Sequence, residues 1–271
     1  MWLYTVDQRS TIEIAQQLDV CHDTVCDRLE KRGIGRRNLS VAHTIYLRDD
    51  FSGDPLEKAY LQGFCYGDVT IAMCNEGPNC VTIQVSAGTT RPMQLQLYHE
   101  LFSPYGHASS SQTPSGCCHF KCNLNMSFAF LLEQQDCIPA WILQDLQKGN
   151  ESPLLSFTAG YTDAEGHFHV RADGKNSDFR LRSYDVGVLR QLQVLFNGRL
   201  GIFCPPVHLD APQGTPIKGT LYSTNDDCWC LGVYRKASLY QLCELLDPYM
   251  KHADRRQDMY AVQANVRARG V

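Results

Sequence analysis

The chain has 271 residues, enough for one large domain or for two medium-sized domains and a small module. Its net charge of −4 at pH 7 is not the basic balance that is typical of nucleic-acid-binding proteins, and its 44% of apolar residues is ordinary for a globular protein. No stretch approaches the roughly 20 apolar residues of a membrane span, and the first residues lack the pattern of a signal peptide. We therefore expect a protein without a membrane segment.

The thirteen cysteines are scattered along the chain, and their number is odd. This usage is not typical of a secreted disulfide framework and indicates an intracellular, reducing compartment, which could be cytoplasm, nucleus or organelle. Three groups could suggest zinc: 117–122, 228–230, and Cys21 with Cys26. None has paired CxxC spacing, and two lie on predicted strands, where successive residues face opposite ways. We interpret these cysteines as buried or half-buried thiols.

Residues 1–40 have the pattern of a helix-turn-helix. Apolar spacing predicts one helix over 11–18, a short turn, and a second helix over 22–32. The pattern resembles the small DNA-binding domains of recombinases and of some endonucleases, in which the second helix enters the major groove. The residues that would then contact DNA are Thr24, Arg28, Arg36 and Arg37. A small helical module for protein contacts is the alternative interpretation.

Two later stretches share one design. In the first, Asp54 and Pro55 open a predicted helix that leads through Gly63 to Asp68. In the second, residues 152–166, Ser152 is the expected N-cap, Pro153 opens the helix, and Gly166 lets the chain leave it after Glu165. Gly63 and Gly160 are 97 positions apart, as are Asp68 and Glu165. Self-similarity over a domain-sized interval indicates two related halves.

The two carboxylates are expected to share a site. A negative charge at the end of a helix opposes the helix dipole, so that a bound cation would have to stabilise Glu165. Gly63 and Gly160 leave little side chain between the two helices, so the backbones can approach closely. Both acids would then lie side by side at a pseudo-two-fold axis, where they can hold a divalent cation.

The segments between these stretches predict the same order of elements in both halves: helix, hairpin, helix, hairpin, helix. This is an α+β architecture with two four-stranded antiparallel sheets. The predicted strands are 69–74, 80–86 and 117–126 in the first half and 167–172, 179–184, 199–203 and 228–234 in the second. The predicted helices in the first half are 91–102, a helical stretch that follows the strand 117–126 and ends at 135, and 139–148. In the second half they are 186–196, 238–250 and a short last helix after 251.

The stretches LQGFCYGD (61–68) and GYTDAEG (160–166) resemble the two LAGLIDADG motifs of single-chain homing endonucleases. The first copy departs from the family pattern, because Tyr66 replaces an acidic residue and Val69 replaces the final glycine, but it retains Asp68. The resemblance covers about residues 54–260. It implies two pseudo-symmetric half-domains, 54–148 and 152–262, whose saddle-shaped sheets straddle double-stranded DNA.

The same resemblance implies a monomer that makes a metal-dependent double-strand break in a long asymmetric target. Asp68 and Glu165 would be the catalytic metal ligands, joined by the backbone carbonyls of Gly67 and Ala164. Oxygen-only ligands suit Mg²⁺, for which Mn²⁺ or Ca²⁺ can substitute. The family usually has a lysine near each active site, and Lys121 and Lys236 are the candidates.

Strand alternation predicts which side chains face DNA. In the second half the candidates are His169, Arg171, Arg180 and Arg182, with Arg255 and Arg256 reaching phosphates after the last long helix. In the first half they are Thr70, Thr82, Gln84 and Ser86. Residues 41–150 carry 5 basic and 10 acidic side chains, against 14 and 13 in 151–271, so we expect weaker DNA binding by the first half. A solvated outer sheet surface is the alternative.

Two other functions fit the same fold. One is a catalytically silent DNA-binding regulator, although both acids are retained. The other is a maturase that binds intron RNA.

Overall fold

The computed structural model describes residues 1–7, 9–37, 48–67, 69–74, 82–114, 116–133, 136–216 and 223–270. Internal contacts divide the chain into two units: residues 1–47 with 73–82, and residues 48–72 with 83–271. Among the described residues, no helix has the length and apolar character that crossing a membrane requires.

The described part of the N-terminal unit includes the helices α1 (Trp2–Thr5), α2 (Thr11–Leu18) and α3 (His22–Glu30). The α2 helix begins with a capping box, in which Ser10 accepts from the N–H of Glu13 at 3.1 Å and the Glu13 carboxylate accepts from the N–H of Ser10 at 2.7 Å. Asp19 adopts a left-handed conformation (φ 51°) and lets the chain turn. The core consists of Tyr4, Ile14, Ala15, Val25 and Leu29. The two predicted helices are thus confirmed.

The larger unit consists of two repeats with the same order of elements. The first contains α5 (Pro55–Cys65), β1 (Val69–Met73), β2 (Ile83–Thr89), α6 (Pro92–Phe102), β3 (Ala108–Gln112), β4 (Cys118–Leu124), the 3₁₀ helix η1 (Met126–Leu132) and α7 (Ala140–Gln147). The second contains α8 (Ser152–Glu165), β5 (Gly166–Val170), β6 (Ser177–Ser183), α9 (Val186–Gly198), β7 (His208–Ala211), β8 (Cys228–Val233), α10 (Lys236–Leu246) and α11 (Ala253–Ala268). The sheet orders correspond, β1-β2-β4-β3 and β5-β6-β8-β7.

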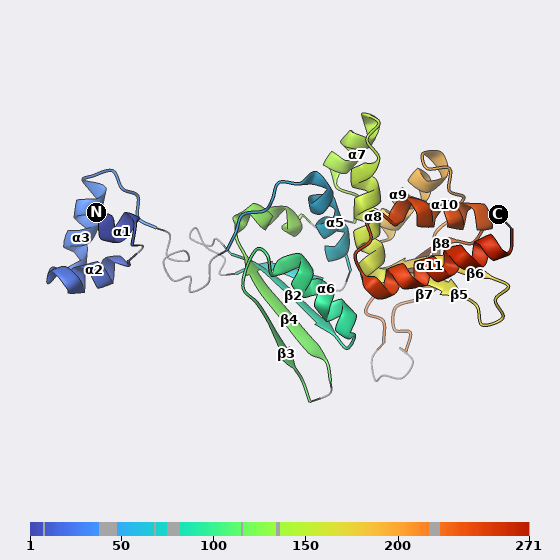
Figure 1. Cartoon of the computed structure of the whole chain (residues 1–271), viewed down its shortest axis with the longest axis horizontal. Coiled ribbons are helices and arrows are strands. Elements are labelled where there is room, and N and C mark those ends of the chain that lie inside the picture. Colours follow the sequence, from blue (N-terminus) through green and yellow to red (C-terminus); the bar gives the residue numbers. More distant parts are fainter. Residues whose placement is uncertain are drawn as a thin grey trace. The chain divides into compact units, whose positions relative to one another are not determined.

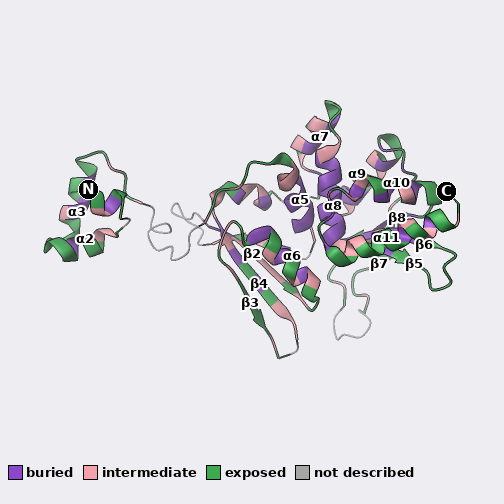
Figure 2. Ribbon diagram, in the orientation of Figure 1, coloured by how far each residue is buried: buried purple, intermediate pink, exposed green. Residues whose placement is uncertain are grey.

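The helices α5 and α8 lie side by side between the two sheets (Figure 1). A methyl group added at Gly63 would lie 2.0 Å from the carbonyl oxygen of Phe157, and one added at Gly160 would lie 2.1 Å from that of Tyr60. Tyr60 and Phe157 are themselves 97 positions apart, so the two contacts are related by the pseudo-two-fold axis. Figure 2 shows that α8 is buried along almost its whole length. The predicted glycine-mediated packing is confirmed.

The third strand of the second repeat was predicted over 199–203, and this is wrong. Leu200 and Ile202 are buried in the core without joining a ladder, and Gly201 has a positive φ of 65°. Two prolines follow at 205–206, and the edge strand β7 begins only at His208. The first repeat also has an edge strand, β3, that was not predicted, since its sequence ASSSQ lacks apolar alternation.

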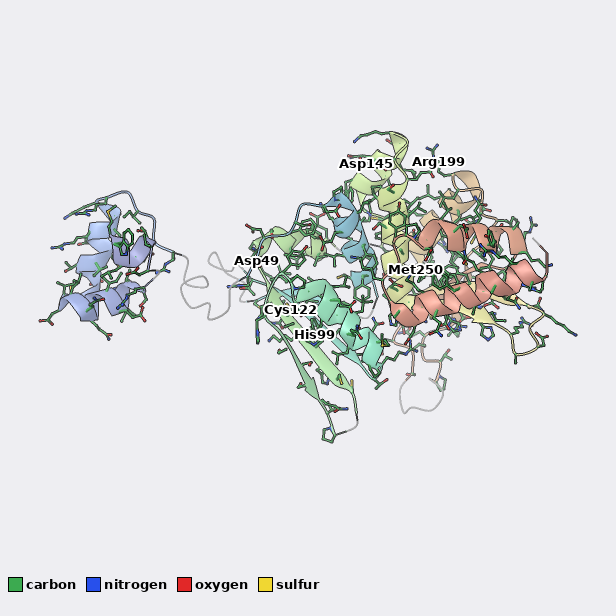
Figure 3. All side chains as sticks on the ribbon, in the orientation of Figure 1. Asp49, His99, Cys122, Asp145, Arg199 and Met250 are labelled. Atoms are coloured by element: carbon green, nitrogen blue, oxygen red, sulfur yellow. The ribbon has the colours of Figure 1, made fainter. Side chains whose placement is uncertain are left out.

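Both ends of α8 differ in detail from the expectation. Glu151 occupies the N-cap position and Ser152 lies inside the helix, where its N–H is accepted by the Asn150 side chain at 3.3 Å. Glu151 forms an ion pair at 2.9 Å with Arg199, which is labelled in Figure 3. At the other end Gly166 is extended (φ −72°), so its backbone does not require glycine. It is needed for space, because a methyl group there would lie 2.6 Å from the Thr162 carbonyl oxygen.

Candidate metal and nucleic-acid site

The two motif helices end next to each other. A methyl group added at Gly67 would lie 2.5 Å from Cβ of Ala164 and 3.2 Å from Oε1 of Glu165. The Glu165 carboxylate of the second motif therefore lies next to the C-terminal end of the first motif helix. Asp68 follows Gly67 directly but lies outside the described residues. A glycine is required at 67 chiefly because Cβ of Ala164 is so close, and the Glu165 carboxylate beside it offers an oxygen donor of the kind that suits a divalent cation.

A cavity of about 580 Å³ opens at these helix ends and is lined by both repeats. The first repeat contributes Gly88, Thr89, Thr90, Arg91, Gln94 and Cys117, and the second contributes Ala164, Glu165, Gly166, His167, Arg180, Arg182 and Arg255. One carboxylate and four guanidinium groups are thus brought to one cavity. Four guanidinium groups in one cavity favour the binding of an anion such as a phosphate group.

Arg255 is the strongest sign of an anion site. It lies in the first turn of α11, and burial, followed by the charge of Arg91, lowers the pKa of its guanidinium. Its Nε is buried and has no hydrogen-bond partner among the described residues. A buried donor on a cation is unfavourable without a partner, so a bound anion would stabilise this arrangement.

Arg180 and Arg182 project from the face of β6 opposite to the buried Phe179 and Leu181. Arg180 forms an ion pair with the buried Asp178 at 3.0 Å, and Arg182 forms one with Asp210 at 3.0 Å. These carboxylates orient the guanidinium groups and neutralise part of their charge. The pairing favours directional contacts over a diffuse attraction for phosphate.

The acidic residue two positions before Glu165 has a structural role in the second motif. The buried Asp163 accepts hydrogen bonds from the Tyr60 hydroxyl (2.6 Å) and from the N–H groups of Lys251 (2.6 Å) and His252 (3.0 Å). At the equivalent position of the first motif, the Tyr66 hydroxyl donates to the carbonyl of Cys137 at 2.9 Å, just before α7. Tyr66 therefore replaces the family's acid and keeps a tether to the segment that leads into the last helix of its repeat.

The imidazole of His252 fixes the start of α11, and with it Arg255. Its Nδ1 accepts from the N–H of Arg255 at 3.5 Å, which requires an unprotonated nitrogen. Burial, and then the charge of Arg255, lowers the pKa of His252 below its ordinary 6.5. Since protonation is disfavoured in the folded state, this group's contribution to stability is present above pH 6.5 and is lost as the pH falls through the lowered pKa.

We expect the substitution His252→Asn to weaken this pH dependence, because asparagine caps helices and does not titrate. In urea unfolding between about pH 7.5 and about pH 5.5, the natural chain should lose more stability than the variant, by at most about 1.4 kcal/mol per pH unit. Identical pH slopes for the two proteins would contradict this role.

The first sheet presents the predicted polar face. Gln84 and Ser86 alternate with the buried Ile83 and Val85, and Ser86 is directly opposite Lys121 in the ladder. Lys121 and Thr70 are exposed. Thr82, in contrast, is only 9% exposed, so the prediction that it contacts DNA is wrong.

Lys236 was predicted to assist catalysis, and the structure places it elsewhere. Its ammonium donates to the carbonyls of Arg269 (2.8 Å) and Gly270 (3.4 Å), just beyond the C-terminal end of α11. Arg255, at the opposite end of this helix, lines the cavity. At 1.5 Å per residue the two ends are about 20 Å apart, so Lys236 cannot take part there.

Other predicted DNA contacts fall into two groups. His169, on strand β5, and Arg171, directly after this strand, are exposed. His169 stacks on His167, with the ring centroids 5.6 Å apart. Arg256 lies outside the cavity lining and forms an ion pair with Asp247 at 3.0 Å. It therefore does not supply an uncompensated charge.

In the N-terminal unit, Arg28 and Arg36 are exposed and Thr24 is half-buried, with its hydroxyl 3.0 Å from the Cys21 thiol. Arg37 is instead used within the unit. Its guanidinium lies 4.5 Å from the ring centroid of Tyr4 and donates to the carbonyl of Arg9. The prediction that Arg37 contacts phosphate is therefore not supported by its position.

The lining residues that sequence reasoning missed include Thr89, Arg91 and Gln94. Arg91 precedes Pro92 at the start of α6, and its role depends on the approach of the other repeat, which no local pattern reveals. His167 also lines the cavity, on the strand face that it shares with His169, as strand alternation predicts. Burial, and then the charge of Arg255, lowers the pKa of His167, which favours the neutral imidazole.

Comparison with known proteins gives matches at the level of structure. No protein-family model matches the sequence, and no curated protein matches it. Full-length DUF199/WhiA from Thermatoga maritima matches with a TM-score of 0.50 and 8% identity, over 82% of this chain and 63% of that chain. The endonuclease I-DmoI, in complex with its nicked target DNA in the presence of Mn, matches with a TM-score of 0.46 and 14% identity, over 73% and 98%.

The LAGLIDADG meganuclease I-AabMI, bound to uncleaved DNA, matches with a TM-score of 0.46 and 12% identity, over 80% of this chain and 92% of that chain. At such identities the likeness concerns the fold alone. The equivalent sheet orders of the two repeats and the glycine-packed motif helices agree with it. The chain thus has the two-repeat α+β fold, with two equivalent four-stranded antiparallel sheets, that its two motifs predicted.

Proposed function

We propose that the chain is a site-specific DNA endonuclease that makes a metal-dependent double-strand break. The observation that carries this proposal is the meeting of the two motif ends, where the Glu165 carboxylate lies against Gly67 in a cavity with four arginines. A carboxylate that can hold a cation, next to two exposed and two half-buried guanidinium groups, suits a phosphodiester better than a neutral substrate.

Asp68 and Glu165 would hold the divalent cation, with Gly67 and Ala164 supplying backbone oxygens. The bound cation would lower the pKa of a water molecule and neutralise charge at phosphorus. Mg²⁺ suits this donor set, and Mn²⁺ and Ca²⁺ have the same preference for oxygen. Arg255 and Arg91 would bind the non-bridging phosphate oxygens, and Lys121, on the open face of β4, would contact DNA further from the cavity.

The open faces of the two sheets would read the target. In the second sheet the readers would be Arg180 and Arg182, held by carboxylates, with His169 and Arg171 beside them. In the first sheet they would be Thr70, Gln84 and Ser86, which are uncharged. Because the phosphate contacts then come mainly from residues 151–271, we expect the second half to contribute most of the affinity. The N-terminal helices α2 and α3 would extend the contact with DNA.

Cleavage of a randomised plasmid library with Mg²⁺, followed by sequencing of the cut ends, tests the proposal. Cuts at one sequence, absent with Asp68→Asn and with Glu165→Gln, would support it. Tight and sequence-selective binding without cuts would contradict the catalytic part and leave a DNA-binding regulator. If the chain retained no DNA at all, the whole proposal would be wrong, and intron RNA would be the next ligand to test.

We expect Arg255→Gln to weaken DNA binding about 10-fold or more, because it removes a positive charge whose buried Nε has no hydrogen-bond partner among the described residues. The slope of log K against log salt should also fall by about 1. Arg256→Gln is the matched control, because the guanidinium next along the chain is already paired with Asp247. Equal losses of affinity in the two variants would contradict a specific role for Arg255.

A further inference from the structure

Three side chains with metal-binding atoms gather on the second sheet, outside the cavity described above. The ligand atoms of His208, Asp210 and Cys230 all lie within 4.8 Å of one another. The three residues come from two neighbouring strands, since β7 pairs with β8 and His208 lies directly opposite Cys230. Cys230 is 1% exposed, while His208 and Asp210 reach the surface above it.

The local backbone explains why these groups converge. Leu209 is opposite Trp229 and Ala211 is opposite Cys228, so Asp210 is an extra residue in a β-bulge. A bulge bends its strand and changes the direction of a side chain, and such irregularities are common next to functional sites. Here it keeps the Asp210 carboxylate close to the imidazole of His208 and the thiol of Cys230.

A fourth residue orients the carboxylate. Arg182 lies opposite Cys230 on the other neighbouring strand, β6, so that Arg182, Cys230 and His208 form one row across the sheet. Nε of Arg182 lies 3.0 Å from Oδ2 of Asp210. This contact engages one carboxylate oxygen and leaves the other for a metal, as outer-sphere partners of metal ligands commonly do.

We propose that His208, Asp210 and Cys230 bind one Zn²⁺ ion. One nitrogen, one oxygen and one sulfur donor suit this ion, and the sulfur argues against Mg²⁺ or Ca²⁺, which prefer oxygen. Ligand atoms around a tetrahedral zinc are about 3.3–3.6 Å apart, so the atoms of this cluster, which lie within 4.8 Å of one another, would have to move closer by up to about 1.5 Å when the ion binds. The fourth position remains for a water molecule.

The ion would join the short edge strand β7 to the central strand β8 and add positive charge to the face that carries Arg182. An unprotected edge strand is a weak point of a sheet, and a metal that links it to its neighbour would stabilise it. None of the three residues lines the cavity that contains Glu165, and the existence of the site does not depend on DNA cleavage.

Titration of the full chain with Co²⁺, after removal of metals by a chelator, tests the site. An excess of Mg²⁺ occupies the oxygen ligands of the motif acids, and the near-ultraviolet absorption of a cobalt–thiolate bond then reports only on a sulfur-containing site. We expect one equivalent of Co²⁺ to bind, with displacement by Zn²⁺ and a rise in Tm with metal. The absorption should disappear in Cys230→Ser and affinity should fall at least about 10-fold in His208→Ala.

Cys118→Ser is the matched control, because Cys118 is a half-buried strand thiol in the first sheet, outside the cluster. It should bind Co²⁺ as the natural chain does. If Cys230→Ser fails to fold, as judged by circular dichroism, His208→Ala decides, since that side chain is exposed. Absence of the thiolate band in the natural chain, or its persistence at full affinity in His208→Ala, would overturn the proposal.

Discussion

Glu165→Gln is expected to slow plasmid cleavage at least about 10³-fold while DNA affinity changes only a few-fold. The substitution keeps the size of the side chain beside Gly67 and removes the negative charge that would hold the cation. Stabilisation by a catalytic metal is worth several kcal/mol, and about 1.4 kcal/mol corresponds to a factor of ten in rate. Single-turnover cleavage and equilibrium binding of the same target measure the two quantities.

Glu151→Gln is the control, because Glu151 lies at the opposite end of the same helix and pairs with Arg199. It should cleave at the rate of the natural chain. A Glu165→Gln protein that still cuts at that rate would show that the carboxylate has no part in cleavage. Loss of activity in both variants would mean that the assay reports on the stability of α8 rather than on the site.

Gly63→Ala and Gly160→Ala are each expected to destabilise the larger unit by about 3 kcal/mol or more, with a decrease in Tm of roughly 6–12 °C. The added methyl groups would lie 2.0 Å and 2.1 Å from backbone carbonyl oxygens of the other helix. Backbone atoms cannot rotate away as a side chain can, so the two helices would have to separate. Differential scanning calorimetry measures the change.

Gly198→Ala is the control for these two variants. It makes the same chemical change at the end of α9, where an added methyl group would meet nothing within 4 Å. Since alanine favours helix, the variant should be as stable as the natural chain or more stable by up to about 1 kcal/mol. Unchanged stability in Gly63→Ala would contradict the close helix contact on which the site depends.

The fold could be predicted from the sequence where one local pattern determined the result. The repeated helix start, glycine and carboxylate at an interval of 97 residues predicted two related halves and their contact at the glycines. The edge strands could not be found in this way. The serine-rich β3 has almost no apolar alternation, and the apolar residues Leu200 and Ile202, which do alternate, fill the core between elements. Edge strands pair on one side only, so their sequences are less constrained.

The candidate site was predictable only in part, for a different reason. Glu165, Arg180 and Arg182 belong to short-range patterns of helix end and strand face. Arg91 reaches the cavity because two repeats come together, and no sequence pattern shows that approach. Lys236 was chosen from its position after a strand, but the ammonium is used at the far end of α11. The position of the end group of a long, flexible side chain is therefore difficult to predict from the sequence.

The central claim is that the ends of two glycine-packed helices make one metal site. The most direct test is binding of Mn²⁺ to the full chain, measured by electron paramagnetic resonance, for the natural protein, Asp68→Asn and Glu165→Gln. We predict that the natural chain binds Mn²⁺ and that each single substitution removes or strongly weakens this binding, because both acids hold the same ion. Binding that is unchanged in both variants would contradict the claim.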